Sequence, residues 1–315
     1  MIYWCGGEDF DFPSGTRLST STDSSKFDAT YSRCTLSGGR AYSKVFPKIS
    51  NGWLHCFCGA SGGTSATSSY CGITTDDGIT GYHIYVTQYG RMAIYRWNGS
   101  WASLAINSVN YNATTTTYDL YFDYEGGILR LYKSRGANPY LSYTGDLSIS
   151  GVDGFNRVCV YSSNVNYSSF SQVIVSDTDT RQMNLLTMAP TASGTVNDFT
   201  GQFSDINSVA WNDGTFMVAT DPDKTAYVNI ADVGALTGVV KAIKVATRSA
   251  TNDDELDLRV GFESGGDLYL GQALNLTGNF DLYEEILHKN PITDKVFTSA
   301  ELDGLQLAFR TVSTV

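Results

Sequence analysis

Positive charge is scarce in this sequence. Its 315 residues contain 21 lysines and arginines against 32 aspartates and glutamates, which gives a formal net charge of -11. A protein that neutralises nucleic-acid phosphates needs clustered basic side chains. We therefore expect no nucleic acid among its partners, and the acidic residues, spread in twos and threes, are typical of solvated loops.

Long apolar runs are also missing. No stretch approaches the roughly 20 apolar residues of a membrane-spanning helix, so we expect no membrane insertion. The opening residues MIYWCGGEDFDF have neither the basic leader nor the apolar core of a secretory signal, and we expect no signal peptide. The body is nevertheless rich in Ser, Thr and Tyr, like an extracellular protein. A protein made in the host cytoplasm that works outside after lysis would combine both features.

Residues typical of catalysis are few. The chain has only three histidines, His55, His83 and His288, each within a strand-like run and without a Gly-x-Ser-x-Gly nucleophile elbow. A glycoside hydrolase needs two facing carboxylates, for which Asp119 with Asp123 is only a loose candidate. The interpretation favoured is structural histidines and a protein that is not an enzyme, with glycan hydrolysis the less favoured alternative.

Metal-site patterns are weak as well. The six cysteines, all in the first half, allow free buried thiols, disulfides or a metal site at Cys56 and Cys58 with His55, and free thiols are favoured because Cys-x-Cys lacks the usual spacer. The Asp-rich run 176–180 could supply oxygen ligands to calcium, but it lacks EF-hand spacing and favours a turn. No cofactor is expected.

Short strands separated by turns fill the sequence. Residues 82–104 predict a three-strand meander in which Asn98-Gly99 forms a two-residue type I′ hairpin loop. Residues 118–122 and 128–132 predict another hairpin. Strands recurring every 8–12 residues without amphipathic helices indicate an all-β antiparallel β-sandwich.

The length suits two domains. The run SDTDT ends a buried strand, and we place the junction at Asp177, with domains at 1–177 and 178–315, each a β-sandwich and the second smaller. Pro190 and the residues TASGT predict a turn-rich piece. Thr298 and Glu301 form a capping-box pattern that predicts one short helix near 298–304.

Aromatic residues are abundant, with 20 tyrosines and 5 tryptophans. Those of the meander could form a face that contacts a glycan or a protein partner, although packing explains most tyrosines of an all-β chain. The candidate contact residues are Tyr82, Tyr85, Tyr95, Trp97 and Trp101.

Four segments carry a resemblance to a known family. They are YWCGGEDFDFPSG (3–15), SQVIVSD (171–177), its continuation DTDTRQMNLLTMAPTASGTVNDFTG (177–201) and NPITDKVFTSAELDGLQLAFRTV (290–312). Together with the aromatic hairpins they resemble structural proteins of tailed bacteriophages, in which a concanavalin A/laminin G-like jelly roll precedes a smaller β domain.

The resemblance implies a virion component of the tail, neck or fibre. Such a protein acts through contacts with other virion proteins, forms a homo-oligomer, and can attach to the host surface. The alternative is a lectin-like, carbohydrate-binding module that recognises host surface glycans. The resemblance supplies no functional residue, calcium ligand or sugar ligand at matching positions.

Overall fold

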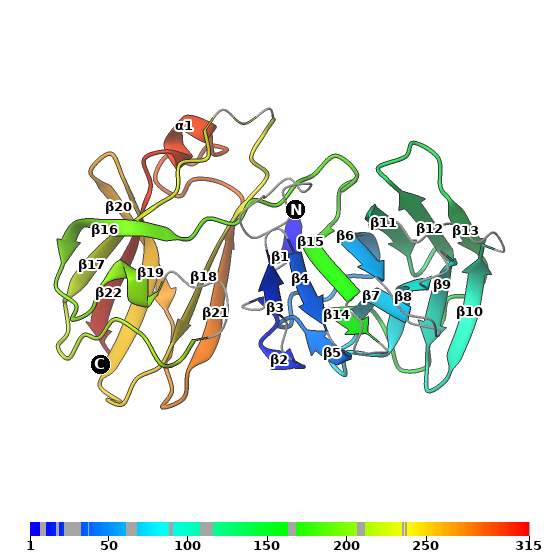
Figure 1. Ribbon diagram of the computed structural model, residues 1–315, viewed down its shortest axis with the longest axis horizontal. Coiled ribbons are helices and arrows are strands. Elements are labelled where there is room, and N and C mark those ends of the chain that lie inside the picture. Colours follow the sequence, from blue (N-terminus) through cyan, green and yellow to red (C-terminus); the bar gives the residue numbers. More distant parts are fainter. Residues whose placement is uncertain are drawn as a thin grey trace. The chain divides into compact units, whose positions relative to one another are not determined.

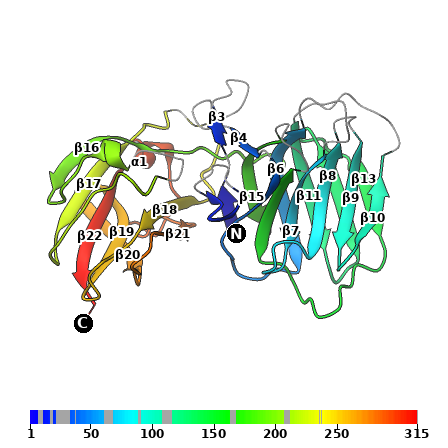
Figure 2. The same ribbon diagram turned by 60° about the horizontal axis from the view of Figure 1, so that its bottom comes forward.

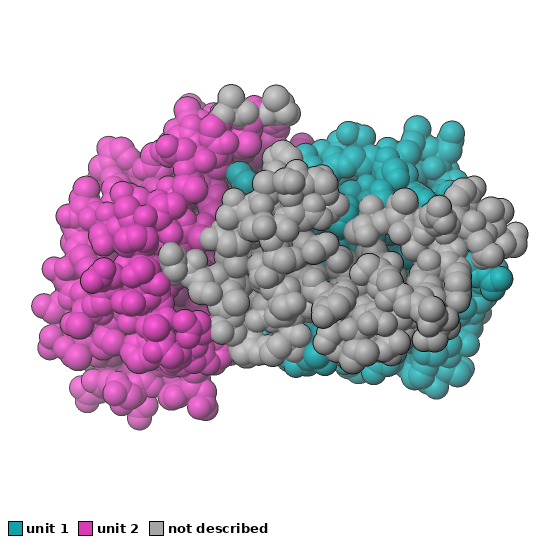
Figure 3. All heavy atoms as spheres, viewed as in Figure 1, with its two compact units in different colours: residues 1–187 teal, residues 188–315 magenta. Residues whose placement is uncertain are grey.

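The structure is a computed structural model that describes residues 1–6, 11–16, 19–21, 33–36, 38–60, 68–87, 91–107, 116–162, 168–206, 212–234, 236 and 238–314. The chain divides into two compact units, Met1–Thr187 and Met188–Val315 (Figures 1 and 3). Each unit is built from antiparallel strands. The predicted all-β fold, a jelly-roll β-sandwich followed by a smaller β-sandwich, is confirmed.

The first unit consists of two sheets (Figure 2). Within the described ranges, the eight-stranded sheet has the order β13 (Leu141–Thr144), β12 (Ile128–Lys133), β11 (Thr116–Asp123), β6 (Asn51–Ala60), β15 (Ser168–Ser176), β4 (Arg33–Leu36) and β3 (Ser19–Ser21), and β1 (Ile2–Gly6) also pairs with β15. The seven-stranded sheet has the order β10 (Trp101–Ile106), β9 (Met92–Trp97), β8 (Gly81–Thr87), β7 (Ser68–Thr74), β14 (Arg157–Ser162), β5 (Gly39–Tyr42) and β2 (Ser14–Gly15).

Alternation along the strands sorts the side chains of each sheet. Successive residues of a strand point to opposite faces. Leu54, Leu120 and Val175 of the eight-stranded sheet meet Ile84 and Val160 of the seven-stranded sheet in one buried core. The residues between them in sequence therefore lie on the outer faces, where a functional surface can form.

The hairpins lie where the sequence predicted them, but one of their turns differs from the prediction. Strands β8, β9 and β10 form the predicted meander, and β11 pairs with β12 as predicted. The prediction of a two-residue type I′ loop at Asn98-Gly99 is wrong. Trp97 pairs with Trp101, which leaves three residues in the loop, and of these only Gly99 has a positive φ, +97°. A third residue, Ser100, lengthens the turn beyond the two-residue form.

The second unit is the smaller sandwich. In the part of it that is described, one sheet has the order β16 (Pro190–Asn197), β17 (Thr225–Ile230), β22 (Gln306–Ser313), β19 (Leu256–Ser264) and β20 (Asp267–Ala273), and the other pairs β18 (Ile243–Ser249) with β21 (Asp281–Leu287). A short 3-10 helix, η2 (Phe203–Asp205), follows β16. Val245, Leu258 and Val260 belong to a core between the two sheets.

Two local predictions for this unit have clear outcomes. The helix is confirmed as α1 (Ser299–Leu302), because the Thr298 side chain accepts from the Glu301 N–H and the Glu301 carboxylate accepts from the Thr298 N–H. The turn-rich interpretation of 190–195 is wrong, since these residues form β16. Pro190 is tolerated there because it is the first residue of an edge strand.

The division between the units lies ten residues after the junction expected at Asp177. Residue Asp177 does follow the end of β15, but the segment up to Thr187 belongs to the first unit. Side-chain contacts of Thr180 and Arg181 hold this segment to the outer face of the eight-stranded sheet. The short polar residues of the sequence predicted the turn after β15, but they did not predict the contacts of Thr180 and Arg181.

Across the described ranges, no helix is long and apolar enough to cross a membrane.

Candidate functional site

The seven-stranded sheet carries aromatic side chains on its outer face, where an antiparallel sandwich usually shows polar residues. Ile84 and Ile94 point to the core, so their neighbours in β8 and β9 point outward. We define the aromatic face as the outward residues Tyr70, His83, Tyr85, Tyr95, Trp97, Trp101 and Tyr161.

Trp101 lies over the centre of this face. Its ring centroid is 4.9 Å from that of Trp97, 5.0 Å from His83, 5.4 Å from Tyr70 and 5.9 Å from Tyr95. The residue nevertheless remains 39% exposed. Its indole therefore covers the rings below and presents an apolar surface to solvent.

His83 lies beneath Trp101 and is completely buried. Its Nε2 is 2.7 Å from the carbonyl oxygen of Ile79, so Nε2 carries the proton and donates. Burial lowers the pKa of His83 to about 4, against the opposing effect of that hydrogen bond. The imidazole is thus a neutral part of the floor, in agreement with the structural role expected for it.

One end of the face is basic. The Arg40 Nε–H donates to the Tyr70 hydroxyl at 2.8 Å, and its guanidinium carbon lies 5.4 Å from the Tyr161 ring centroid. Tyr161 in turn stacks on Tyr70 with centroids 4.3 Å apart. The Arg157 guanidinium lies over the Tyr42 ring at 5.8 Å. Two arginines are therefore held among tyrosines at the β5–β14 side.

Four of the five contact residues proposed from the sequence lie together on this face. Tyr85 and Tyr95 have ring centroids 5.0 Å apart, and Trp97 and Trp101 continue the row. Tyr82 does not belong with them. It is 0% exposed, belongs to the core, and donates its hydroxyl to the Leu147 carbonyl. Period-2 alternation places it on the same face as Ile84, which removes it from the contact residues.

Sequence reasoning missed the other half of the face. Tyr70, Tyr161 and Arg40 are far apart in the chain but become neighbours because β7, β14 and β5 are adjacent in the sheet. Their outward alternation with Cys71, Val160 and Ala41 was a usable signal for which side they occupy. The strand order that unites them was not readable from one sequence.

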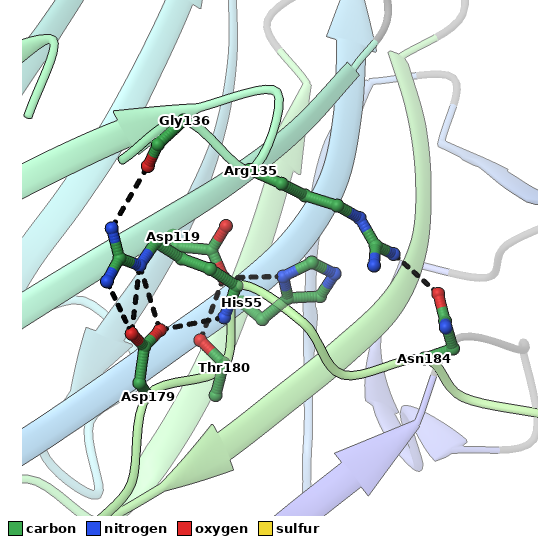
Figure 4. A network of polar contacts seen from close by, with 8 residues as sticks. His55, Asp119, Arg135, Gly136, Asp179, Thr180 and Asn184 are labelled. Carbon is green, nitrogen blue, oxygen red and sulfur yellow. Dashed lines mark hydrogen bonds and ion pairs between the residues drawn. The ribbon is translucent and has the colours of Figure 1, made fainter. Parts of the chain in front are cut away.

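A second polar cluster lies on the outer face of the eight-stranded sheet (Figure 4). His55 of β6 and Asp119 of β11 are cross-strand partners, both 0% exposed, with His55 Nδ1 2.7 Å from Asp119 Oδ1. The Thr180 hydroxyl donates to the same oxygen at 2.8 Å. His55 Nε2 and Asp119 Oδ2 are buried without a hydrogen-bond partner in the described part of the chain.

Arg181 fastens the segment over this cluster. Its guanidinium carbon lies 4.5 Å from the Tyr132 ring centroid and 5.5 Å from that of Trp53, and its Nη1 donates to the carbonyls of Gly136 and Ala137. Asp179 accepts from the same guanidinium, which lowers the pKa of Asp179.

This second cluster is covered by the chain and does not form an accessible binding site. The His55–Asp119 pair is covered, so no substrate can reach it. Asp123, the other carboxylate considered for hydrolysis, accepts from the Gly126 N–H in the β11–β12 turn. The possible calcium loop is a turn, in which Ser176 Oγ accepts from the Thr178 N–H.

The cysteines take no part in either cluster. Cys56 and Cys58 point into the core while His55 points outward, so these three do not converge on a metal. Cys5, Cys71 and Cys159 are also buried, and Cys56, Cys71 and Cys159 are free thiols; the Cys34 side chain lies outside the described residues.

The second unit has a cavity of about 210 Å³ between β18–β21 and β19–β20. Val245, Val260 and Leu274 form its apolar walls. Glu285 points into it and accepts from the Tyr269 hydroxyl at 2.7 Å, which together with burial raises the pKa of Tyr269 to about 12. None of the residues proposed from the sequence lies there.

Comparison with known proteins gives the following similarities. No family model and no curated protein matches the chain. Among solved structures, it is similar to the carbohydrate-binding module CBM66 from Bacillus subtilis (12% identity, TM-score 0.36, 52% of this chain and 95% of that chain). It is also similar to the T. cruzi calreticulin globular domain (12%, 0.38, 57% and 89%) and to the metal-free carbohydrate recognition domain of Emp46p (12%, 0.35, 52% and 88%). Similarity at this level does not indicate a function.

Proposed function

We propose that the first unit is a carbohydrate-binding module whose aromatic face receives a glycan. The observation that carries the proposal is Trp101, which is 39% exposed and rests on Tyr70, His83, Tyr95 and Trp97. A rigid indole with an open surface can stack on the apolar C–H side of a sugar ring, and tyrosine hydroxyls beside it can exchange hydrogen bonds with sugar hydroxyls.

The packing of the face supports recognition rather than catalysis. The rings are held by one another, so they lose little conformational entropy when a ligand binds. The one histidine among the residues of the face is buried and neutral. The face thus offers stacking and hydrogen bonding.

A glycan array probed with the full chain tests the proposal. Binding to one or more glycans is expected, and Trp101→Ala should weaken it about tenfold or more, because exposed central aromatic residues dominate interface energies. Phe216→Ala is the matched control, since Phe216 is an exposed aromatic of the second unit at 45%. Absence of any bound glycan, or equal binding by the Trp101 variant, would reject the proposal.

The virion role remains a prediction from the sequence resemblance. In that setting the aromatic face would attach a particle to host surface glycans, and the chain would contact other virion proteins and further copies of itself. Mass spectrometry of purified phage particles tests this location, and absence of the chain from them would refute it.

A further inference from the structure

We infer that the aromatic face selects acidic glycans, with Arg40 and Arg157 binding a carboxylate or sulfate group of the sugar chain. The inference rests on the proposed function, because it names the class of ligand for the same face. It starts from the two guanidinium groups at the β5–β14 side.

Neither arginine has a carboxylate partner in the described part of the chain. Elsewhere in the same residues, Arg181, Arg248 and Arg310 each pair with an aspartate. Arg96 and Arg135 likewise bond carbonyl or amide oxygens rather than carboxylates, so what distinguishes Arg40 and Arg157 is their place beside the aromatic face. Arg40 instead contacts Tyr70 and Tyr161, and Arg157 contacts Tyr42 and the Asp76 carbonyl.

The two guanidinium groups are held in place by their contacts. The Arg40 Nε–H is held by Tyr70, and its plane lies beside Tyr161, which restricts the side chain to the outer face. Arg157 Nε is buried without a hydrogen-bond partner in the ranges that the structure describes. That nitrogen is covered, so an anionic oxygen of a ligand would be bound by the Nη groups, which carry the other four N–H donors of a guanidinium.

The positions of the arginines fit a ligand that crosses the strands. Arg40 of β5 is aligned with Tyr161 of β14, then with Tyr70 of β7 and Tyr85 of β8. Strands in a sheet are about 4.8 Å apart, so the row from β5 to β9 spans roughly 19 Å. A short oligosaccharide can therefore reach from the indoles to Arg40. The guanidinium forks match the two oxygens of a carboxylate, or two of the three terminal oxygens of a sulfate ester.

The net charge of -11 does not prevent this recognition. At physiological ionic strength the Debye length is about 8 Å, so exposed carboxylates far from the face are screened. A guanidinium in direct contact with an anionic group is screened much less. The two arginines therefore act on a ligand in direct contact with them, and the charge of Asp77, which also acts on His83, opposes them.

Paired probes test the inference on the full chain. The array hits are compared with their uncharged counterparts: uronate and sialylated glycans with their methyl esters, and sulfated glycans with desulfated forms. We expect the charged form to bind more tightly, and Arg40→Gln to weaken it about tenfold to a hundredfold, the range of a lost hydrogen bond to a charged group. Carboxylate-only or sulfate-only binding identifies which group the arginines hold.

Three further variants make the result interpretable. Arg40→Lys keeps the charge and should retain part of the preference, Arg157→Gln should lower it, and Arg130→Gln, an exposed arginine on the outer face of the other sheet, should leave it unchanged. Thermal unfolding shows whether each variant is folded. The inference would be overturned if the neutral form of each hit bound as tightly as the charged form, and if Arg40→Gln bound both as tightly as the unaltered protein does. Glycan binding itself would then still stand. No hits at all would overturn both.

Discussion

The ring of Trp101 lies 5.4 Å from the ring of Tyr70, although strands β8 and β9 separate β10 from β7 in the sheet. The indole therefore extends from the edge strand across the outer face, over His83. This arrangement gives the face its exposed aromatic surface, and it buries the imidazole of His83 beneath.

Removing the indole should change the titration of His83. Its pKa is about 4 because it is buried, and Trp101 is part of what covers it. We expect Trp101→Ala to raise the pKa of His83 toward the ordinary 6.5, measured from imidazole chemical shifts during an NMR pH titration. Phe216→Ala should leave it unchanged. An unaltered pKa in the Trp101 variant would show that the indole does not cover His83.

His83 also makes the stability depend on pH. Between about pH 4 and 6.5 the unfolded chain binds a proton that the folded chain does not, so the free energy of unfolding falls as the pH falls through this window. The loss is about 3 kcal/mol at most. The carboxyls of Asp77 and Asp179, whose pKa values lie below 3.8, contribute only at lower pH.

A variant without the imidazole separates this contribution. The amide of Gln in His83→Gln can donate to the Ile79 carbonyl and does not titrate, so urea unfolding at pH 7 and pH 4.5 should show a smaller difference than in the unaltered protein. If the free energy of unfolding changed equally between pH 7 and pH 4.5 in both proteins, the acid sensitivity would come from another group.

Arg181 should hold the segment 177–187 on the first unit. We expect Arg181→Ala to lower the free energy of unfolding by about 1–3 kcal/mol, because it leaves the Gly136 and Ala137 carbonyls without their donor and removes packing on Trp53 and Tyr132. Limited proteolysis should then cut the segment faster. Arg310→Ala, which removes an exposed ion pair with Asp223, should change stability by less than about 1 kcal/mol. Equal effects of the two changes would contradict a special role for Arg181.

Gly72 should be required beneath the aromatic face. A Cβ at this position would lie 2.1 Å from Nδ1 of His83, which is buried and is held by its hydrogen bond to the Ile79 carbonyl. Gly72→Ala is expected to destabilise the protein by about 1–3 kcal/mol, the usual cost of overpacking, as measured by chemical denaturation. Gly238→Ala, where a Cβ meets nothing within 4 Å, is the control. A fully stable Gly72 variant would mean that the imidazole is not fixed over the strand.

The sequence predicted local features better than long-range ones. Alternation and turn residues located β8 to β12 and the capping box of α1, because these depend on neighbours in the chain. The same alternation assigns Tyr82 to the core, so this exclusion was available from the sequence. The contacts of Tyr70 with Tyr161 and of Asp119 with Thr180 depend on strand order and on a chain segment folding back. Neither follows from local periodicity.

Binding of a glycan by the indoles of the aromatic face can be followed through the indole N–H signals of the full chain. The protein has 5 tryptophans, so a two-dimensional NMR spectrum gives few signals, and single Trp→Phe changes assign them. On titration with the strongest array ligand, we expect the signals of Trp97 and Trp101 to shift in proportion to occupancy while those of Trp4 and Trp53 stay in place. Shifts confined to Trp53, or saturation without change at Trp97 and Trp101, would show that the glycan does not bind at the aromatic face.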